Sequence, residues 1–525
     1  MMTESFALNR RQLMSGAAML ASATAMPLRA AEAAIVVETN AGRLRGAQRN
    51  GVCAFLGVPY GAPTDGARRF RPPAPVQKWD GVRDALAYGQ ACPQLSDGPG
   101  SPTNQGDDCL NLNVWTPACD DGQRPVMVWL HGGVLATGSG SAPSTEGTRL
   151  AGRRDVVVVN VTHRLNIFGY LYLEELGEES FNVGQLDIVA ALQWVRDNIA
   201  HFGGDPDNVT IFGESGGGTK VAGLLQMPAA SGLFHKAIMQ SGFGTLTHTR
   251  EAGEAMARSL MAAMSVSRAD DLRAFTYEQL LEGFRKISGG HVLRSPMMVA
   301  DGEVVPGFML PHKIPPLAQN IPMMVGHTVT ETSVLFPPAG VFEFDWEDAA
   351  RELGKRYRDP ADLVAAFRRL MPDAPPSEIV LTITTIEAMG YNSRALSDAR
   401  ASAPGAPAFT YMLAWKTPIQ GGRLGAPHAL DVPLVFDNVQ ANVPLFGDGV
   451  PEAERVADAM SAAWAAFARS GTPNAPGLPE WPAYTTQQRE TMVFNLESKA
   501  ANDPWGEKYA LLARHAIAGP PNGSG

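Results

Sequence analysis

The sequence lacks an excess of basic residues. Its 525 residues include 53 Asp and Glu against 43 Lys and Arg, which gives a formal charge of -10. Proteins that bind nucleic acid need a basic surface, because their Lys and Arg side chains neutralise phosphates and release counterions. We therefore expect no nucleic-acid partner, and a mildly acidic balance of this size is common among enzymes.

Cysteine is also scarce: the chain has four, and it contains no C-x-x-C pair or Cys/His cluster. Such clusters supply the ligands of zinc sites, so we expect neither a metal nor another cofactor. Cys92 and Cys109 flank a polar segment rich in Pro and Gly, residues 93–108. An oxidising compartment would allow these two cysteines to close the segment as a disulfide loop. Cys53 and Cys119 are expected to be unpaired thiols without a catalytic role.

After its N-terminal region the chain contains no run of eighteen apolar residues, about the length that spans a bilayer as a helix. At the N-terminus, Arg10 and Arg11 precede an uncharged, alanine-rich segment, residues 15–28. A twin arginine before a short, weakly apolar stretch is typical of a Tat-type export signal. We interpret residues 1–33 as a cleaved signal and expect an exported, periplasmic protein without a stable membrane anchor. An amphipathic helix with two surface arginines is the alternative.

The remaining chain alternates short apolar runs with segments of helical periodicity. Residues 126–130 and 156–160 are continuous apolar runs, typical of parallel strands buried on both faces. Residues 110–115 alternate apolar and polar side chains, which predicts a half-buried strand. The other predicted elements are edge strands or loops at 35–38 and 52–58, a helix at 187–202, strands at 209–212, 237–240 and 322–326, and mostly helical insertions at 251–317 and 346–400.

This order of elements predicts an α/β protein with a large, mostly parallel central sheet and helices on both faces. Helical insertions of this kind are expected to lie over a site rather than to fold separately. We therefore expect a single catalytic domain over residues 34–525.

The sequence GESGG at residues 213–217 directly follows the strand predicted at 209–212. A G-x-S-x-G motif in this context is typical of a nucleophile elbow, in which a strand ends on a strained serine and a helix begins. The glycines allow neighbouring backbone to approach closely. Ser215 is therefore the candidate nucleophile, although five-residue patterns also arise by chance.

A glycine-rich turn, HGGV at residues 131–134, follows the strand predicted at 126–130. In enzymes with a nucleophile elbow, such a turn and the residue after the nucleophile supply the N–H groups that stabilise an oxyanion. The candidate donors are the N–H groups of Gly133, Val134 and Gly216. The alternative is a turn whose glycines serve only packing.

A serine nucleophile needs a base and an acid that orients the base. Among ten histidines, His428 lies in a Pro- and Gly-containing loop after the serine, in the order that this fold class uses. The acid should lie between them. Glu331 follows a predicted strand and satisfies this order, and Asp301 is not excluded. A neutral histidine base would lose activity as the pH falls below about 6.5.

Longer stretches resemble the type-B carboxylesterases, a branch of the α/β-hydrolase superfamily that includes the cholinesterases. The sequence GDDCLNLNV at residues 106–114 is similar to the family's second signature, E-D-C-L-Y-L-N-V. Other similar stretches are NVGQLDI at 182–188, ALQWVRDNIAHFGGDPDNVT at 191–210, FRPPAP at 70–75 and WPAY at 481–484. The resemblance covers most of the chain after the signal and implies the α/β-hydrolase fold, with helical insertions over the active site.

The resemblance implies a serine carboxylesterase that hydrolyses small-molecule esters through an acyl-enzyme and needs no cofactor. On this sequence it assigns the triad to Ser215, Glu331 and His428, and the oxyanion donors to Gly133, Val134 and Gly216. It also implies a disulfide between Cys92 and Cys109, a supporting serine at Ser241 and a buried structural carboxylate at Glu214. Non-catalytic adhesion proteins of the same fold, and hydrolases of amides, thioesters or carbamates, are the alternatives.

The sequence departs from the family within this same site. Val134 stands where the family usually has Gly or Ala, and its two methyl groups are expected to disfavour bulky or tertiary esters. Gly216 replaces the usual Ala after the nucleophile, and Glu331 lies in T-E-T instead of D-E-G. Residues 93–108 contain no aromatic residue, which argues against quaternary ammonium substrates like those of cholinesterases.

Overall fold

The structure is a computed structural model that describes residues 34–95, 101–177, 180–242, 247–308 and 311–517. The interpreted export signal, with Arg10 and Arg11, lies outside the described residues. Among the described helices, none is long and apolar enough to cross a membrane.

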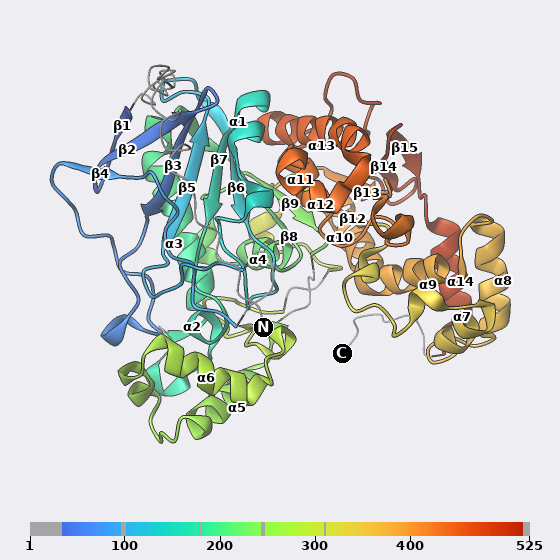
Figure 1. Ribbon diagram of the computed structural model, residues 1–525, viewed down its shortest axis with the longest axis horizontal. Coiled ribbons are helices and arrows are strands. Elements are labelled where there is room, and N and C mark those ends of the chain that lie inside the picture. Colours follow the sequence, from blue (N-terminus) through green and yellow to red (C-terminus); the bar gives the residue numbers. More distant parts are fainter. Residues whose placement is uncertain (1–33, 96–100, 178–179, 243–246, 309–310, 518–525) are drawn as a thin grey trace, which may run out of the picture.

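A thirteen-stranded sheet runs through the middle of the molecule (Figure 1). Its strand order is β1-β2-β3-β5-β7-β6-β8-β9-β12-β13-β14-β15, and β4 pairs with β2. The successive pairs from β7-β6 to β13-β14 are parallel, whereas the pairs from β1 to β7 along this order and the pair β14-β15 are antiparallel. The bounds are β1 (Ala34–Thr39), β2 (Gly42–Arg49), β3 (Val52–Pro59), β4 (Val82–Asp84), β5 (Asn111–Thr116), β6 (Arg124–Leu130), β7 (Val157–Val161), β8 (Gly204–Glu214), β9 (Lys236–Gln240), β12 (Met323–Thr328), β13 (Ala408–Leu413), β14 (Glu490–Phe494) and β15 (Lys499–Asn502).

The apolar runs form the central parallel strands because successive side chains enter two different cores. In β6, Val126, Val128 and Leu130 pack into one core, whereas Met127 and Trp129 pack into the other. The first core also contains side chains of α3 (Val183–Asn198) and α4 (Gly216–Leu224). The second contains side chains of α1 (Thr148–Arg154), α11 (Asp431–Val435) and α13 (Val450–Ser470). The predicted sheet with helices on both faces is thus confirmed.

One predicted strand differs in its burial. The alternating pattern at residues 110–115 predicted a half-buried strand, but every residue of β5 is buried. The prediction was wrong because β5 lies between β3 and β7, with a core on each face. Its polar side chains are satisfied internally: Asn113 Nδ2 donates to Gly140 O at 3.0 Å, and Asn111 Nδ2 donates to Gln90 O at 2.8 Å.

Two helical insertions extend from the sheet (Figure 1). The first contains α5 (Arg250–Ala263) and α6 (Tyr277–Ser288) and a small parallel pair, β10 (Thr247–His248) with β11 (Met298–Val299). The second contains α7 (Trp346–Leu353), α8 (Pro360–Leu370), α9 (Pro376–Thr385), a π-helical turn (Ile386–Gly390) and α10 (Tyr391–Ser402). The remaining helices are α2 (Asn166–Tyr170), α12 (Val443–Phe446) and α14 (Gly506–His515).

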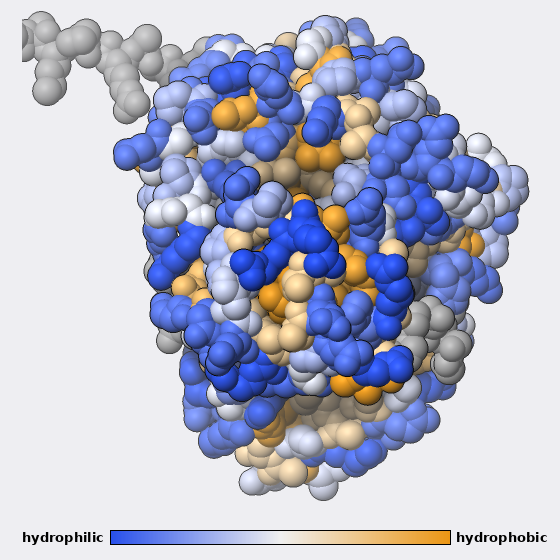
Figure 2. All heavy atoms as spheres, turned by 90° about the vertical axis from the view of Figure 1, so that its right-hand side faces the viewer, coloured by the Kyte–Doolittle hydropathy of each residue, from blue (hydrophilic) through white to orange (hydrophobic). Residues whose placement is uncertain are grey.

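The second insertion has a hydrophobic cluster of its own. Side chains of α7, α8 and α9 pack there with Met412 of β13 and with Leu511 and Leu512 of α14. Seen from this side, the molecule exposes mostly hydrophilic residues, with smaller hydrophobic areas between them (Figure 2). The hydrophobic cluster thus attaches the second insertion to β13 of the sheet and to α14.

The four cysteines form two close pairs of free thiols. Cys92 and Cys109 are fully buried and their thiols are in hydrogen-bond contact, but the implied disulfide is not formed in the structure. Cys53 of β3 contacts Cys119, which follows β5. Neither of these two forms a disulfide, in line with the expected free thiols. Their proximity was not expected from the sequence.

Candidate active site

Five neighbouring strands deliver the candidate residues to one edge of the sheet. β6, β8, β9, β12 and β13 are mutually parallel neighbours, so their carboxyl ends lie at the same edge. Sites in open α/β sheets form at this edge. The segments that follow these strands carry, in sheet order, the HGGV turn, Ser215, Ser241, Glu331 and His428.

The segment around Ser215 is a sharp turn from β8 into α4. Ser215 has φ 56° and ψ −121°, a strained conformation for a residue with a side chain. Its N–H donates to Gln240 O at 2.8 Å. A Cβ on Gly217 would lie only 2.0 Å from Leu130 O, so the helix start packs directly against the end of β6. The strained elbow predicted from the G-x-S-x-G motif is present.

The HGGV turn lies beside the start of α4. Gly133 and Val134 have φ values of 87° and 59°. A Cβ on Gly216 would lie 1.9 Å from Val134 O, so the two segments are in direct backbone contact. Within the described part of the chain, no group accepts a hydrogen bond from the N–H groups of Gly133, Val134 or Gly216. These three donors are thus available to a developing oxyanion.

His428 lies between two buried carboxylates. Its Nδ1 contacts Glu331 Oε2, and its Nε2 lies 3.1 Å from Glu214 Oε1 in an ion pair that is not aligned as a hydrogen bond. Glu331 Oε1 also accepts from Ser241 Oγ at 2.5 Å and from Thr328 N at 2.7 Å. The structure therefore brings Glu331, His428, Ser241 and Glu214 together in one cluster. Among the described contacts there is no hydrogen bond between Ser215 Oγ and His428.

Asp301, the alternative acid, lies elsewhere. Its Oδ1 accepts from the N–H groups of Glu303 and Val305, and its Oδ2 accepts from Asn182. Both carboxylate oxygens of Asp301 thus accept hydrogen bonds that hold the first insertion in place. Glu331 is the acid in contact with His428. The geometry favours Glu331 over Asp301 as the partner of the histidine.

Burial and neighbouring charges shift the titration of the site. Burial lowers the pKa of His428, but the charges of Glu214 and Glu331 outweigh this effect and raise its pKa to about 9. Burial raises the pKa of Glu214 to about 8, although the charge of His428 opposes the shift. Burial also acts to raise the pKa of Glu331, but the charge and hydrogen bond of His428 bring it below its usual value. Glu331 is therefore ionised at neutral pH, whereas Glu214 changes its protonation at about pH 8.

A buried polar layer behind the histidine was missed by the sequence reasoning. Asp431, three residues after His428, accepts from Gln240 Nε2 at 2.9 Å and from Tyr411 OH at 2.7 Å. Gln240 Oε1 in turn accepts from Trp464 Nε1 at 3.1 Å. The layer joins β9, β13 and α13 beneath the histidine loop. These partners are far apart in the chain, so no local pattern of the sequence indicated the layer.

The comparisons with known proteins show the family of the chain. The carboxylesterase family model matches residues 33–512. The chain belongs to the carboxylesterase family. It is 36% identical to the para-nitrobenzyl esterase of Bacillus subtilis over 491 residues, which cover 91% of this chain and 98% of that protein. It is also 35% identical to the phenmedipham hydrolase of Pseudarthrobacter oxydans, over 88% of this chain and 95% of that protein.

Solved carboxylesterase structures share the fold. A carboxylesterase of Geobacillus stearothermophilus superposes with a TM-score of 0.78 at 37% identity, covering 91% of this chain and 99% of that one. The predicted family and the α/β-hydrolase fold are thereby confirmed, and the chain is a carboxylic ester hydrolase. Among the described residues, no group of three or more His, Cys, Asp or Glu could hold a metal ion.

The first insertion packs against the segment that follows the HGGV turn. A small pocket beside the HGGV turn is lined by Ala136 and Thr137, and by Phe284, His291 and Val292 of the insertion. Phe284, His291 and Val292 come from the end of α6 and the turn after it. The predicted insertion at residues 251–317 therefore contacts residues 136–137, just after the HGGV turn.

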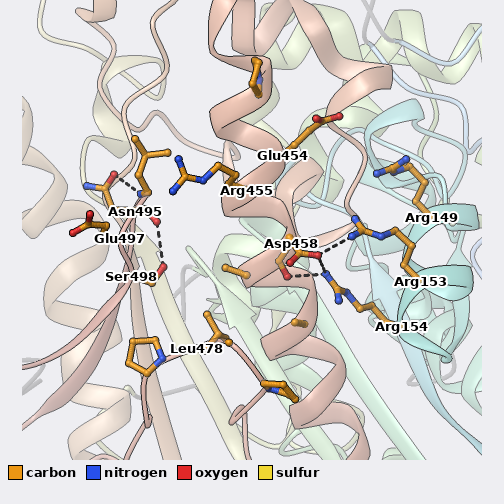
Figure 3. Close-up of a pocket in the computed structure, with 17 residues that line it drawn as sticks. Arg149, Arg153, Arg154, Glu454, Arg455, Asp458, Leu478, Asn495, Glu497 and Ser498 are labelled. Atoms are coloured by element: carbon orange, nitrogen blue, oxygen red, sulfur yellow. Dashed lines mark hydrogen bonds and ion pairs between the residues drawn. The ribbon is translucent and has the colours of Figure 1, made fainter.

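A wide groove lies away from these residues. It has a volume of about 1110 Å³ and is lined by α1, α13 and the β14–β15 turn, including Arg149, Arg153, Arg154, Arg455 and Asp458 (Figure 3). Most of these arginines are already paired: Arg153 and Arg154 both contact Asp458 Oδ1, at 2.8 and 2.5 Å. None of the candidate catalytic residues lines this groove.

Proposed function

We propose that the protein is a serine carboxylesterase in which Ser215, His428 and Glu331 form the catalytic triad. The observation that carries the proposal is the position of His428. Its Nδ1 contacts the buried Glu331, and its Nε2 faces the elbow residue next to Ser215. A carboxylate on Nδ1 fixes the imidazole tautomer in which Nε2 can accept a proton.

The reaction follows from this arrangement. His428 Nε2 takes the proton of Ser215 Oγ as the oxygen attacks the ester carbonyl, and Glu331 stabilises the imidazolium. The N–H groups of Gly133, Val134 and Gly216 stabilise the oxyanion, each lowering the barrier by about 3 kcal/mol. The alcohol leaves with the proton from His428, and water then hydrolyses the acyl-enzyme. To start this cycle, Nε2 must turn from Glu214 to Ser215.

The proposed triad is tested by Ser215→Ala. Wild type and variant are compared on p-nitrophenyl acetate and p-nitrophenyl butyrate, with circular dichroism to confirm that the variant is folded. We expect kcat to fall by at least about 10⁴-fold, because the nucleophile is lost. Turnover that survives in the variant would exclude the serine mechanism. A wild type inactive on every ester would favour the non-catalytic alternative.

We infer small esters as the substrate class. The related Bacillus subtilis protein is named a para-nitrobenzyl esterase, and this chain shares more than a third of its residues with it. Val134 adds two methyl groups at the oxyanion turn, where the acyl group is held during attack. Esters of short, unbranched acids should therefore be hydrolysed faster than tertiary or bulky ones.

We propose further that the chain is exported and that export closes the Cys92–Cys109 disulfide. The twin arginine at Arg10 and Arg11 supports the first part, and the contact between the two buried thiols supports the second. Expression of the full chain in a Tat-competent bacterium tests both. We expect a shortened, periplasmic protein, and a mass that rises by 2 Da on reduction of that disulfide. A Lys pair in place of Arg10 and Arg11 should keep the chain in the cytoplasm.

A further inference from the structure

A buried lysine lies beneath the two backbone segments that carry the oxyanion donors. Lys220 is in the second turn of α4 and is fully buried. Its Nζ donates a hydrogen bond to His131 O at 2.7 Å. His131 opens the HGGV turn, and α4 begins at Gly216. One side chain thus connects the helix that provides one donor with the turn that provides the other two.

The hydrogen bond from Lys220 to His131 O lies where a small backbone shift would move the candidate oxyanion donors. The helix start and the turn touch without side chains between them, because Cβ atoms on Gly216 and Gly217 would lie within 2.0 Å of Val134 O and Leu130 O. The His131 carbonyl belongs to the peptide unit that leads into Gly132 and Gly133. Holding this carbonyl orients the peptide planes that follow it, and oxyanion stabilisation depends on N–H groups held in a fixed direction.

Burial of this amine is costly for folding. Burial lowers the pKa of Lys220 to about 7, so its charge is disfavoured in the folded protein. An apolar residue of the same length would avoid that cost and would extend the apolar face formed by Val221 and Leu224. Groups that a fold retains at such a cost are found preferentially at functional sites.

The titratable groups next to Lys220 do not replace its role. His131 and His163 stack with their ring centroids 5.0 Å apart, and both are buried. Burial lowers the pKa of each, and the charge of Lys220 lowers it further, so both imidazoles stay neutral. His131 Nδ1 is held by Gly132 O at 2.9 Å. The turn is therefore fixed by its own histidine on one side and by Lys220 on the other.

We propose that Lys220 is a positioning residue for the oxyanion hole: its hydrogen bond to His131 O fixes the HGGV turn against the start of α4. The inference rests on the proposed serine esterase function. It assigns to Lys220 no contact with the substrate and no proton transfer.

The test uses Lys220→Met, which keeps the length of the side chain and removes the donor. We expect kcat on p-nitrophenyl acetate to fall about 10- to 100-fold, within the range for the loss of one oxyanion contact. KM should stay within about 3-fold, because ester binding precedes oxyanion formation. The melting temperature should stay the same or rise. Active sites are counted with a phosphonate ester that reacts with Ser215, so that kcat refers to folded enzyme only.

Two ketones separate positioning from a general packing effect. Trifluoromethyl butyl ketone forms a tetrahedral adduct with the nucleophile and places an oxyanion in the hole, whereas methyl butyl ketone binds as a neutral ground-state analogue. Lys220→Met should weaken the first by the same factor as kcat and leave the second unchanged. Lys220→Gln, which keeps a shorter N–H donor, should retain more of kcat than Lys220→Met.

The matched control is Lys236→Met. Lys236 is also a buried lysine, at the start of β9, and its Nζ donates to Asn208 Oδ1 at the opposite edge of the sheet. This variant should leave kcat and both ketone affinities unchanged. An unchanged kcat in Lys220→Met, or a loss of kcat accompanied by equal loss of both ketones and of melting temperature, would overturn the proposal. Failure of the proposed function itself would show differently, as a wild type without Ser215-dependent turnover.

Discussion

The HGGV turn and the residue after the candidate nucleophile are in direct steric contact. The Val134 carbonyl occupies the place where a Cβ at position 216 would lie, at a distance of 1.9 Å. The type-B carboxylesterases usually have Ala at this position and Gly or Ala in place of Val134. Both departures lie at this contact, where Val134 has φ 59° and a Cβ after Ser215 would collide with the Val134 backbone.

This coupling predicts a non-additive pair of substitutions. Gly216→Ala should lower kcat by about 100-fold, because the new methyl group displaces the Val134 carbonyl and with it the candidate donors. Adding Val134→Gly should restore at least about a tenth of the wild-type kcat, since glycine lets the turn relax away from residue 216. The measurement is a double-mutant cycle on p-nitrophenyl acetate. Additive effects of the two substitutions would show that they do not share a contact.

The side chain of Val134 predicts a limit on acyl size. Val134→Gly removes two methyl groups from the oxyanion turn, so esters of tertiary acids should gain at least about 10-fold in kcat/KM relative to acetate. The assay compares p-nitrophenyl pivalate with p-nitrophenyl acetate in both proteins. If the ratio of the two rates does not change, Val134 does not limit the acyl pocket.

The two carboxylates around His428 predict the pH dependence of activity. In the proposed mechanism His428 accepts a proton only when it is neutral, so activity should be lost as the pH falls through its pKa. Burial lowers that pKa, but the charges of Glu214 and Glu331 raise it to about 9. The acid limb of kcat/KM should therefore lie above the free-histidine value of about 6.5, higher than the sequence alone suggested.

Glu214→Gln removes one of these charges and should move the acid limb to lower pH by about one unit. The measurement is kcat/KM between pH 5 and 10 on p-nitrophenyl acetate. Glu490→Gln, which removes a buried carboxylate bonded to Thr485 at the start of β14, should leave the profile unchanged. A wild-type limb at or below 6.5 would contradict the electrostatic argument.

β12 ends in a turn that carries Glu331, the candidate triad acid, whereas Asp301 supports the first insertion. Asp301 accepts two N–H groups of its own loop and contacts Asn182 at the start of α3. Asp301→Ala should lower the free energy of unfolding by about 3 kcal/mol, because buried donors lose their acceptor. The kcat of active-site-titrated enzyme should not change.

Glu331→Ala, in contrast to Asp301→Ala, should lower kcat, by about 10³- to 10⁴-fold. Circular dichroism and urea unfolding separate the two effects. A loss of kcat in Asp301→Ala that matches the loss in Glu331→Ala would mean that the acid has been assigned to the wrong strand.

The sequence could predict the elements that are local in the chain. The apolar runs of β6, β7 and β8 and the motifs at their ends place the HGGV turn and Ser215 without any long-range information. β13 to β15 were not predicted, because polar residues such as Thr410 and Thr491 interrupt their apolar runs. His428 follows β13 by a loop, so its position could be inferred only from chain order and the family resemblance. The contacts of Lys220, Gln240 and Asp431 join separate elements, and such pairings leave no local pattern.

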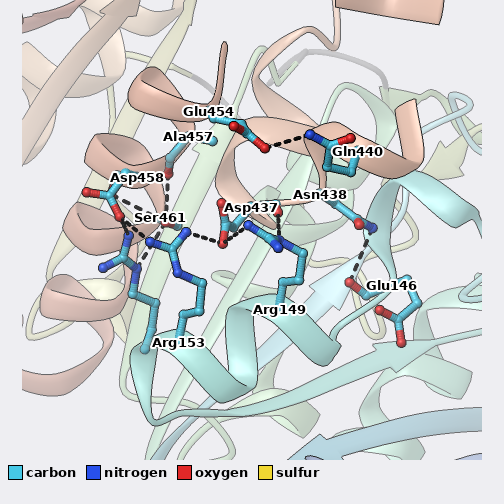
Figure 4. Close-up of polar contacts among 11 residues, drawn as sticks. Glu146, Arg149, Arg153, Asp437, Asn438, Gln440, Glu454, Ala457, Asp458 and Ser461 are labelled. Atoms are coloured by element: carbon cyan, nitrogen blue, oxygen red, sulfur yellow. Dashed lines mark hydrogen bonds and ion pairs between the residues drawn. The ribbon is translucent and has the colours of Figure 1, made fainter. Parts of the chain in front are cut away.

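At the scale of the whole molecule, an arginine cluster holds α1 against the C-terminal part of the chain (Figure 4). Arg149 and Arg153 of α1 contact Asp437, and Arg153 and Arg154 contact Asp458 of α13. Asp437 lies two residues after α11, the helix that follows the His428 loop. The side chain of Asp437 is 0% exposed and that of Asp458 is 56% exposed. The two carboxylates thus meet the same arginines in very different environments.

This difference predicts unequal contributions to stability. Asp437→Ala should lower the free energy of unfolding by about 3 kcal/mol, because its arginines lose their buried partner and the cavity left behind is polar. Asp458→Ala should lower it by less than about 1 kcal/mol, since water and salt screen an exposed pair. Urea unfolding at low salt and at 1 M salt measures both, and added salt should reduce only the effect at Asp458. Equal losses would mean that the cluster acts as one exposed network, and α1 would then be held to α13 by apolar packing alone.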